Sequence, residues 1–80
     1  MKILKFSADW CQPCHTLQNT LDSMNLNIDI ESVDIDSDTV RTKKFGIRGV
    51  PTMVLIDDNE KELSRSVGVM SPKKILEWLD

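Results

Sequence analysis

The chain has 80 residues and a formal net charge of −3, with 40% hydrophobic and 29% charged residues. This size and balance predict a single domain over residues 1–80, built around one hydrophobic core. No basic cluster supports nucleic-acid binding, and no stretch approaches the ~20 apolar residues that a membrane span needs. Because Lys5 interrupts the N-terminal apolar run too early for a signal peptide, we expect a cytoplasmic protein. We also expect a monomer with no nucleic-acid or membrane partner.

The first half of the chain predicts a strand, a helix and a second strand. Apolar residues dominate positions 2–7, which we expect to form a buried strand. Pro13 suits the first turn of a helix. The apolar residues that follow it lie three or four positions apart, on one helix face: Cys14, Leu17, Leu21 and Met24. The next expected strand covers residues 26–35, and its apolar positions change phase between Ile30 and Val33, so it has either a bulge or two buried faces.

A short helix and a hairpin are expected next. Residues 38–44 form a polar, weakly amphipathic segment in which Val40 should face inward together with Phe45. A continuous apolar strand covers residues 53–56. An acidic turn should connect it to a weaker edge strand over residues 63–67.

A final helix completes the expected order of elements. Ser71 can cap this helix, with Pro72 at its first position. Its inner face should consist of Pro72, Ile75, Leu76 and Leu79, with Trp78 at the margin. The order is therefore strand, helix, strand, helix, hairpin and helix, an α/β arrangement of type βαβαββα.

Both cysteines lie in the tetrapeptide Cys11-Gln12-Pro13-Cys14. A disulfide across so short a loop would remove little entropy from the unfolded chain, so the pair is a poor structural staple. Two thiols at this spacing can instead exchange electrons with another protein's disulfide. Cys11 should lie at the exposed start of the helix, where free amides and the helix dipole favour an anion, and Cys14 on the buried stripe. A zinc site is the alternative, but only His15 could join the two thiols, so a metal centre would need ligands from a partner chain. We expect no metal and no bound cofactor.

Three segments resemble the thioredoxin family. Phe6-Ser7-Ala8-Asp9-Trp10-Cys11-Gln12-Pro13-Cys14 is similar to its active-site strand and loop, with Gln12 in place of the usual glycine. Phe45-Gly46-Ile47-Arg48-Gly49-Val50-Pro51-Thr52 resembles the segment that carries a cis-proline opposite the cysteines. Val67-Gly68 is similar to the third loop that borders the active site. The resemblance implies a minimal thioredoxin fold of glutaredoxin-like size, with a four-stranded mixed sheet and three flanking helices.

The resemblance and the right-handed crossover rule also predict how the layers are arranged. The cysteine helix and the final helix should cover one face of the sheet, and the helix over residues 38–44 should lie alone on the other. That second face should be thinly covered and should expose apolar side chains. The chain departs from the family because the usual first strand and helix are missing.

A second departure concerns proton transfer. The buried acid that helps to deprotonate the resolving thiol in the family would fall at Lys5, and the lysine that often accompanies it would fall at Ser32. Two placements of Lys5 remain open from the sequence: solvent at the strand margin, or burial near Cys14. A buried lysine would favour a thiolate by its charge but would itself be penalised by desolvation.

The function that the resemblance implies is dithiol–disulfide exchange with protein substrates. Cys11 would be the nucleophile and Cys14 the resolving thiol of a redox-active disulfide. The residues expected to bind substrate are Trp10, Gln12, Pro13, Val50, Pro51, Val67 and Gly68. Clients such as ribonucleotide reductase and an electron-supplying thioredoxin reductase are the implied partners, in electron transport and cell redox homeostasis.

Two rival functions remain open at this point. A glutaredoxin would be recharged by glutathione, but its usual Gly-Gly motif is replaced here by Val67-Gly68-Val69, and Trp10 and Pro13 also argue against it. A redox-inert module would use the same surface only to dock another protein. For Trp10 itself, the alternatives are a shield beside the disulfide and simple packing under the loop.

Overall fold

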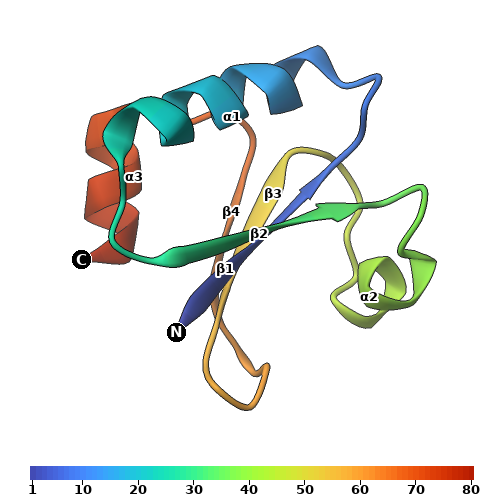
Figure 1. Cartoon of the computed structure of the whole chain (residues 1–80). Helices are drawn as coiled ribbons and strands as arrows, with labels where there is room; N and C mark the ends of the chain where they lie inside the picture. The colour runs from blue at the N-terminus through green and yellow to red at the C-terminus, as the bar shows by residue number, and fades with distance from the viewer.

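Seven elements follow one another in the expected βαβαββα order (Figure 1). The computed structural model describes residues 1–80. Its elements are β1 (Lys2–Ser7), α1 (Gln12–Met24), β2 (Asp29–Asp34), α2 (Thr39–Lys44), β3 (Thr52–Ile56), β4 (Glu62–Val67) and α3 (Pro72–Leu79). The strands form one sheet in the order β2-β1-β3-β4, in which β1 is parallel to β2 and the other neighbours are antiparallel. The predicted four-stranded mixed sheet with three helices is confirmed.

Helices α1 and α3 lie together on one face of the sheet, and α2 lies apart from them beyond the other (Figure 1). This confirms the predicted layers. The hydrophobic core between the two helices and the sheet is formed by Ile3, Leu17, Leu21, Met53, Leu55 and Ile75. Ile30 packs against this core, whereas Val33 belongs to the core of the opposite face. The phase change in β2 therefore reflects burial on both faces, with a regular register along β1 and no bulge.

The face of the sheet beyond α2 has its own core, formed by Leu4, Phe6, Val33, Phe45, Val54 and Ile56. Helix α2 contributes no buried residue to it. Its C-cap residue Phe45 does contribute, with a ring centroid 5.8 Å from that of Phe6. The expectation that this face would be thinly covered is correct for α2 itself. It is wrong for the centre of the face, where Leu4 and Val54 are completely buried.

Charged side chains complete the cover of this second face. Glu31 on β2 accepts ion pairs from Lys2 on β1 and from Arg41 on α2, whose Nη2 lies 2.6 Å from a Glu31 oxygen. Arg65 on β4 is the cross-strand neighbour of Val54 and donates from Nη2 to the Phe45 carbonyl at 2.6 Å. Long charged side chains bury their aliphatic stems along apolar surface while their heads remain hydrated. The second face is thus covered by partly buried charged side chains and by the loop residues Ile35, Ile47 and Val50, which pack against its core.

Strand β2 begins at Asp29, later than the expected residue 26. It can pair only with β1, and the first pair in the register is Lys2 with Asp29. Residues before Asp29 have no strand partner, so Leu26 and Ile28 serve as connection and pack against the helix-covered core.

Three expectations about inward-facing residues are wrong. Val40 on α2 is 76% exposed, because this six-residue helix meets the sheet through its C-terminal end. Leu76 on α3 is 56% exposed and Pro72 is also exposed. Trp78 takes an inward position instead, with its indole N–H donating to Ser64 at 2.8 Å. The buried stripe of α3 is therefore centred on Ile75, and Leu76, about 100° further round the helix, lies outside it.

None of the helices is both long and apolar enough to cross a membrane.

Candidate functional site

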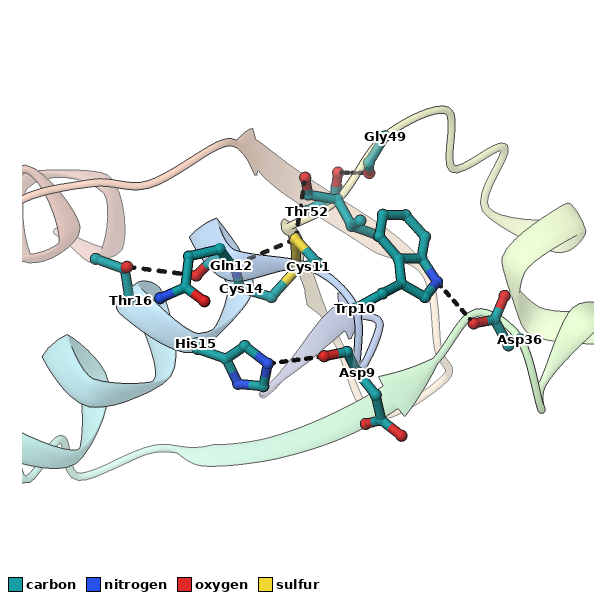
Figure 2. Close-up of a disulfide and its surroundings, with 11 residues drawn as sticks. Asp9, Trp10, Cys11, Gln12, Cys14, His15, Thr16, Asp36, Gly49 and Thr52 are labelled. Atoms are coloured by element: carbon teal, nitrogen blue, oxygen red, sulfur yellow. Dashed lines mark hydrogen bonds between the residues drawn. A yellow bond between two sulfur atoms is a disulfide. The ribbon is translucent and has the colours of Figure 1, made fainter.

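The two cysteines lie where α1 begins (Figure 2). This end of α1 lies next to the ends of the parallel strands β1 and β2 (Figure 1). Cys11 is the N-cap of α1, and its sulfur accepts the backbone N–H of Cys14 at 3.2 Å. The two residues form a disulfide with a Cα–Cα distance of 5.2 Å. Pro13 occupies the first turn of the helix, where a missing N–H leaves no intrahelical bond unmade. The sequence thus places one sulfur directly at a helix N-terminus.

Exposure does not distinguish the two cysteines, contrary to expectation. Cys11 is 4% exposed and Cys14 is 3% exposed, so the predicted exposed helix start is wrong for the Cys11 side chain. Both pack with Ala8, and Ile35 and Val50 close the cluster from the neighbouring loops. What separates the two sulfurs is their hydrogen bonding: the Cys11 sulfur accepts a helix N-terminal amide, an interaction that stabilises a thiolate.

The loop before β3 lies against the disulfide. The Val50–Pro51 peptide bond is cis, as predicted, and the Val50 carbonyl oxygen lies 3.8 Å from the Cys11 sulfur. Pro51 itself is buried, and its carbonyl accepts the N–H of Gly68 at 2.8 Å. The Val50 N–H makes no hydrogen bond within the chain, so this backbone donor stays available next to the sulfur.

The third loop expected from the sequence joins the site through Gly68. Its φ of 91° is a left-handed conformation that favours glycine, and this turn brings its N–H to Pro51. Val67 precedes it as the cross-strand neighbour of Thr52 and is 69% exposed. Gln12 and Pro13 are exposed on the first turn of α1. All the residues predicted for the site therefore come from segments that border the cysteines.

Trp10 lies beside the disulfide, as Figure 2 shows. It is 69% exposed, so the alternative of packing under the loop is wrong. Its indole N–H donates to an Asp36 carboxylate oxygen at 3.0 Å. Sequence analysis did not identify Asp36 as part of the site. A signal was available, because the carboxyl ends of two parallel strands meet at one sheet edge and their following loops become neighbours.

His15 is an exposed helix residue, and one ring nitrogen lies 2.8 Å from the Asp9 carbonyl oxygen (Figure 2). No group of three or more histidine, cysteine or acidic side chains is placed to hold a metal ion.

Lys5 lies on the helix-covered side of β1, and the structure decides between its two expected placements. It is 4% exposed, so the placement in solvent at the strand margin is wrong. Burial lowers the pKa of the Lys5 amine below its usual value of 10.5, and the charge of Asp22 on α1 opposes part of this shift. The pKa therefore moves in the direction that favours a neutral amine.

Comparison with known proteins adds to this geometry. The family model described as Thioredoxin matches residues 1–80. The SPbeta prophage-derived thioredoxin-like protein YosR of Bacillus subtilis is 34% identical over 79 residues, covering 99% of this chain and 95% of that protein. The chain belongs to the thioredoxin family. With its Cys-x-x-Cys pair joined as a disulfide, it is a thiol–disulfide oxidoreductase.

Other proteins of the family show the same likeness, with a smaller share of their own length covered. The thioredoxin of Chlamydia trachomatis is 31% identical over 80 residues, covering 96% of this chain and 78% of that one. Among solved structures, thioredoxin 1 of Thermosipho africanus superposes with a TM-score of 0.83 at 26% identity, over 99% of this chain and 90% of that chain. The fold and the motif order are therefore those of the family.

Proposed function

We propose that this thioredoxin-family protein reduces protein disulfides with Cys11 as the nucleophile and Cys14 as the resolving thiol. The observation that carries the proposal is the hydrogen bond from the Cys14 N–H to the Cys11 sulfur at the N-terminus of α1. This amide and the helix dipole stabilise a Cys11 thiolate, the form that attacks a disulfide. Cys14 comes one turn later on the buried stripe, within disulfide reach of Cys11, and can displace the client from a mixed disulfide.

The surface around the cysteines is suited to an extended client segment. The unpaired Val50 N–H, next to Cys11, can pair with the backbone of such a segment, as in strand addition to a sheet edge. The exposed rings of Trp10 and Pro13 and the exposed side chain of Val67 offer apolar contacts on either side. We assign Trp10, Gln12, Pro13, Val50, Pro51, Val67 and Gly68 to client binding.

The family membership points to disulfide-containing substrates and to a reductase that restores the dithiol. The finer assignment is that residues 1–80 act as one monomeric domain in the cytoplasm, in electron transport. A thioredoxin reductase would supply the electrons, and a disulfide-forming enzyme such as ribonucleotide reductase would be a client. The exposed apolar Trp10 beside the disulfide supports docking to proteins of this kind.

A pair of coupled turnover assays tests the proposal. The purified protein is given insulin as the disulfide substrate, with electrons from either thioredoxin reductase with NADPH or glutathione with glutathione reductase. The proposal predicts rapid turnover with thioredoxin reductase and slow turnover with glutathione. Turnover with glutathione alone would identify a glutaredoxin-like enzyme. No turnover from either source, with the Cys11–Cys14 pair intact, would contradict the assignment and leave a docking module.

A further inference from the structure

Three hydrogen-bonding side chains gather on the helix-covered face of the sheet, next to the cysteines. Lys5 and Ser7 are two residues apart on β1, so their side chains point to the same face. Ser32 on β2 is the cross-strand partner of Lys5 and joins them there. All three line a cavity of about 260 Å³ beside the start of α1. The register of the two parallel strands therefore places one amine and two hydroxyls around a single space.

None of these three groups has a partner within the chain. Lys5 is 4% exposed, yet it takes part in none of the ion pairs. The hydrogen bonds made by serine hydroxyls all belong to serines other than Ser7 and Ser32. Every fully enclosed side-chain nitrogen and oxygen does have a partner, so these three groups keep contact with solvent through the cavity. A buried cation without a counter-charge is costly, and an anion in the cavity would offset that cost.

Asp34 is the acidic residue of β2 that lines the same cavity, and its carboxylate is already engaged. One of its oxygens accepts the backbone N–H of Asp36 at 2.9 Å, and the other accepts the Ser37 hydroxyl at 3.3 Å. Asp34 therefore stabilises its own turn and forms no ion pair with Lys5.

Two further acids lie near the cavity without neutralising Lys5. Asp9 is exposed, and its carboxylate points away from the cysteine pair in Figure 2. Asp22 raises the pKa of Lys5 through its charge, but its carboxylate accepts a hydrogen bond from the Gln18 amide at 2.7 Å. Because these carboxylates surround one ammonium, they disfavour a multiply charged anion in the cavity. The site suits an anion with a single negative charge.

We propose that the cavity binds a small, free monocarboxylate of the size of formate or acetate, held by Lys5 Nζ and by the hydroxyls of Ser7 and Ser32. Its charge matches the one ammonium, and its two oxygens have enough lone pairs to accept from all three donors. A single water needs only about 10–15 Å³ of such space, so formate or acetate fits. Because Lys5 is buried, a molecule that enters the cavity whole reaches it more readily than a carboxylate tethered to a docked protein.

This anion site is independent of the proposed thiol chemistry. Cys14 borders the cavity, but none of the three anion-binding groups is a thiol. The cavity is present with Cys11 and Cys14 joined as a disulfide, so binding is measured on the oxidised protein, in which neither sulfur is a nucleophile. A failure to bind anions would leave the proposed disulfide reduction intact, and inactive thiols would leave the anion site intact.

Titration of the oxidised, isotope-labelled protein with sodium acetate, followed by NMR, tests the proposal. At neutral pH we expect saturable shifts of the backbone amides of Lys5, Ser7 and Ser32, with a Kd of about 1–10 mM for so small a ligand. Sodium chloride and sodium sulfate at matched ionic strength are the comparison salts. Both should bind at least about tenfold more weakly, because chloride lacks a second oxygen to share among the donors and sulfate carries a second charge.

Three variants assign the binding to the residues of the site. Lys5→Met should weaken acetate binding at least about tenfold, because it removes the cation. Ser7→Ala should weaken it about two- to tenfold, because it removes one hydrogen bond and leaves the cation in place. Lys2→Met is the matched control, since Lys2 lies on the same strand but is ion-paired with Glu31 on the opposite face. This variant should bind acetate as the wild type does.

The side-chain resonances of Lys5 give an independent readout. Bound acetate favours the ammonium form, so saturating acetate should raise the Lys5 pKa measured by NMR, and binding should weaken as the pH rises past that pKa. The other titratable groups that line the cavity or act on Lys5 are Asp9, His15, Asp22 and Asp34. Protonation of these groups in acid would also favour an anion, so the comparison is made at neutral and higher pH.

Several outcomes would overturn the proposal. These are shifts that do not saturate, shifts that chloride reproduces at the same ionic strength, and acetate binding that persists unchanged in Lys5→Met. Tighter binding of sulfate than of acetate would also overturn it, because a site for a monocarboxylate should reject the second charge.

Discussion

The charged side chains on the two faces of the sheet differ in burial and in ion pairing. On the face beyond α2, Lys2, Glu31 and Arg41 are ion-paired and only partly buried. On the helix-covered face, Lys5 is buried and has no ion-pair partner. Paired charges near solvent contribute modestly to stability, whereas an unpaired buried charge lowers it. The first set therefore contributes to the structure of the fold, whereas the burial of Lys5 carries a desolvation cost that no ion pair offsets.

The faces also differ in how they are closed. Under α1 and α3, side chains such as Leu17 and Ile75 form a dry core with no exposure. Beyond α2, Phe45 belongs to the core, and Ile35, Ile47 and Val50 from the adjoining loops pack against it. The partly buried side chains of Arg41 and Arg65 lie at its margin, where they bond to Glu31 and to the Phe45 carbonyl. A second hydrophobic core can thus be covered without a second pair of helices, provided that ion pairs fix the long charged side chains over its apolar residues.

The largest effect is expected from the helix-covered core. Leu17→Ala should lower the free energy of unfolding by about 2–5 kcal/mol, because it removes a completely buried side chain and leaves a cavity. The matched control is Val40→Ala on α2, which should change stability by less than about 0.5 kcal/mol because Val40 is 76% exposed. Urea unfolding of both variants measures the difference. Equal losses in the free energy of unfolding would contradict the assignment of Leu17 to the buried core and of Val40 to the exposed surface.

A change of opposite sign is expected for Lys5. Lys5→Met should raise the free energy of unfolding by about 1–3 kcal/mol at neutral pH, because an unpaired buried amine is replaced by an apolar side chain of similar length. Urea unfolding across a pH series gives the measurement. A destabilised Lys5→Met protein would show that the lysine supports the fold and would remove the contrast between the faces.

The pH dependence of that gain follows from the lowered pKa of Lys5. Between the folded-state pKa and the usual value of 10.5, the unfolded chain binds more protons than the native protein, so native stability rises with pH in this window. The gain in the free energy of unfolding of Lys5→Met over the wild type should be largest below the folded-state pKa of Lys5 and should shrink as the pH approaches 10.5. A gain in stability that is constant over this pH range would mean that the pKa of Lys5 in the native protein is not lowered from its usual value.

The smallest effect is expected from the ion pairs of the second face. Hydrogen bonds from Arg41 and then Lys2 lower the pKa of Glu31 to about 2. Its stabilising contribution is complete above the usual value of 4.5 and is lost as the pH falls through about 2. Because Glu31 is 36% exposed, Glu31→Gln should cost less than about 1 kcal/mol at neutral pH.

A pair of unfolding series at neutral and acidic pH checks this prediction. The loss in Glu31→Gln should disappear in acid, where wild-type Glu31 is itself protonated, and Glu60→Gln at an exposed turn serves as the control. A loss that persists unchanged at the lowest pH would assign it to packing instead of charge.

The sequence was sufficient to predict the order of elements from local periodicity. The sheet and the segments around the cysteines were predicted from short motifs that resemble those of the thioredoxin family. The sequence failed where a residue's environment depends on distant parts of the chain. The exposure of Val40 depends on how α2 meets the sheet, and that of Leu76 depends on the inward turn of Trp78. The burial of Cys11 depends on Val50 and Ile35, which lie far along the chain.

Two contacts of the site illustrate the same limit. The bond between Trp10 and Asp36 joins loops that follow different strands, so spacing along the chain does not reveal it. Lys5 on β1 and Cys14 on α1 line one pocket, which forms only when α1 packs against the sheet. The sequence could raise the question of Lys5 but could not choose between its two placements.

The assignment of Cys11 as the nucleophile and Cys14 as the resolving thiol is tested most directly by trapping the mixed disulfide with a client. Cys14→Ser protein is mixed with a disulfide-bonded client, and the products are mapped by mass spectrometry. Because Cys11 holds the stabilised sulfur and Cys14 is needed for release, a covalent mixed disulfide through Cys11 should accumulate. The Cys11→Ser protein should form little or no adduct under the same conditions. An adduct on Cys14 in Cys11→Ser, formed as fast as the adduct on Cys11 in Cys14→Ser, would contradict the assignment of the nucleophile.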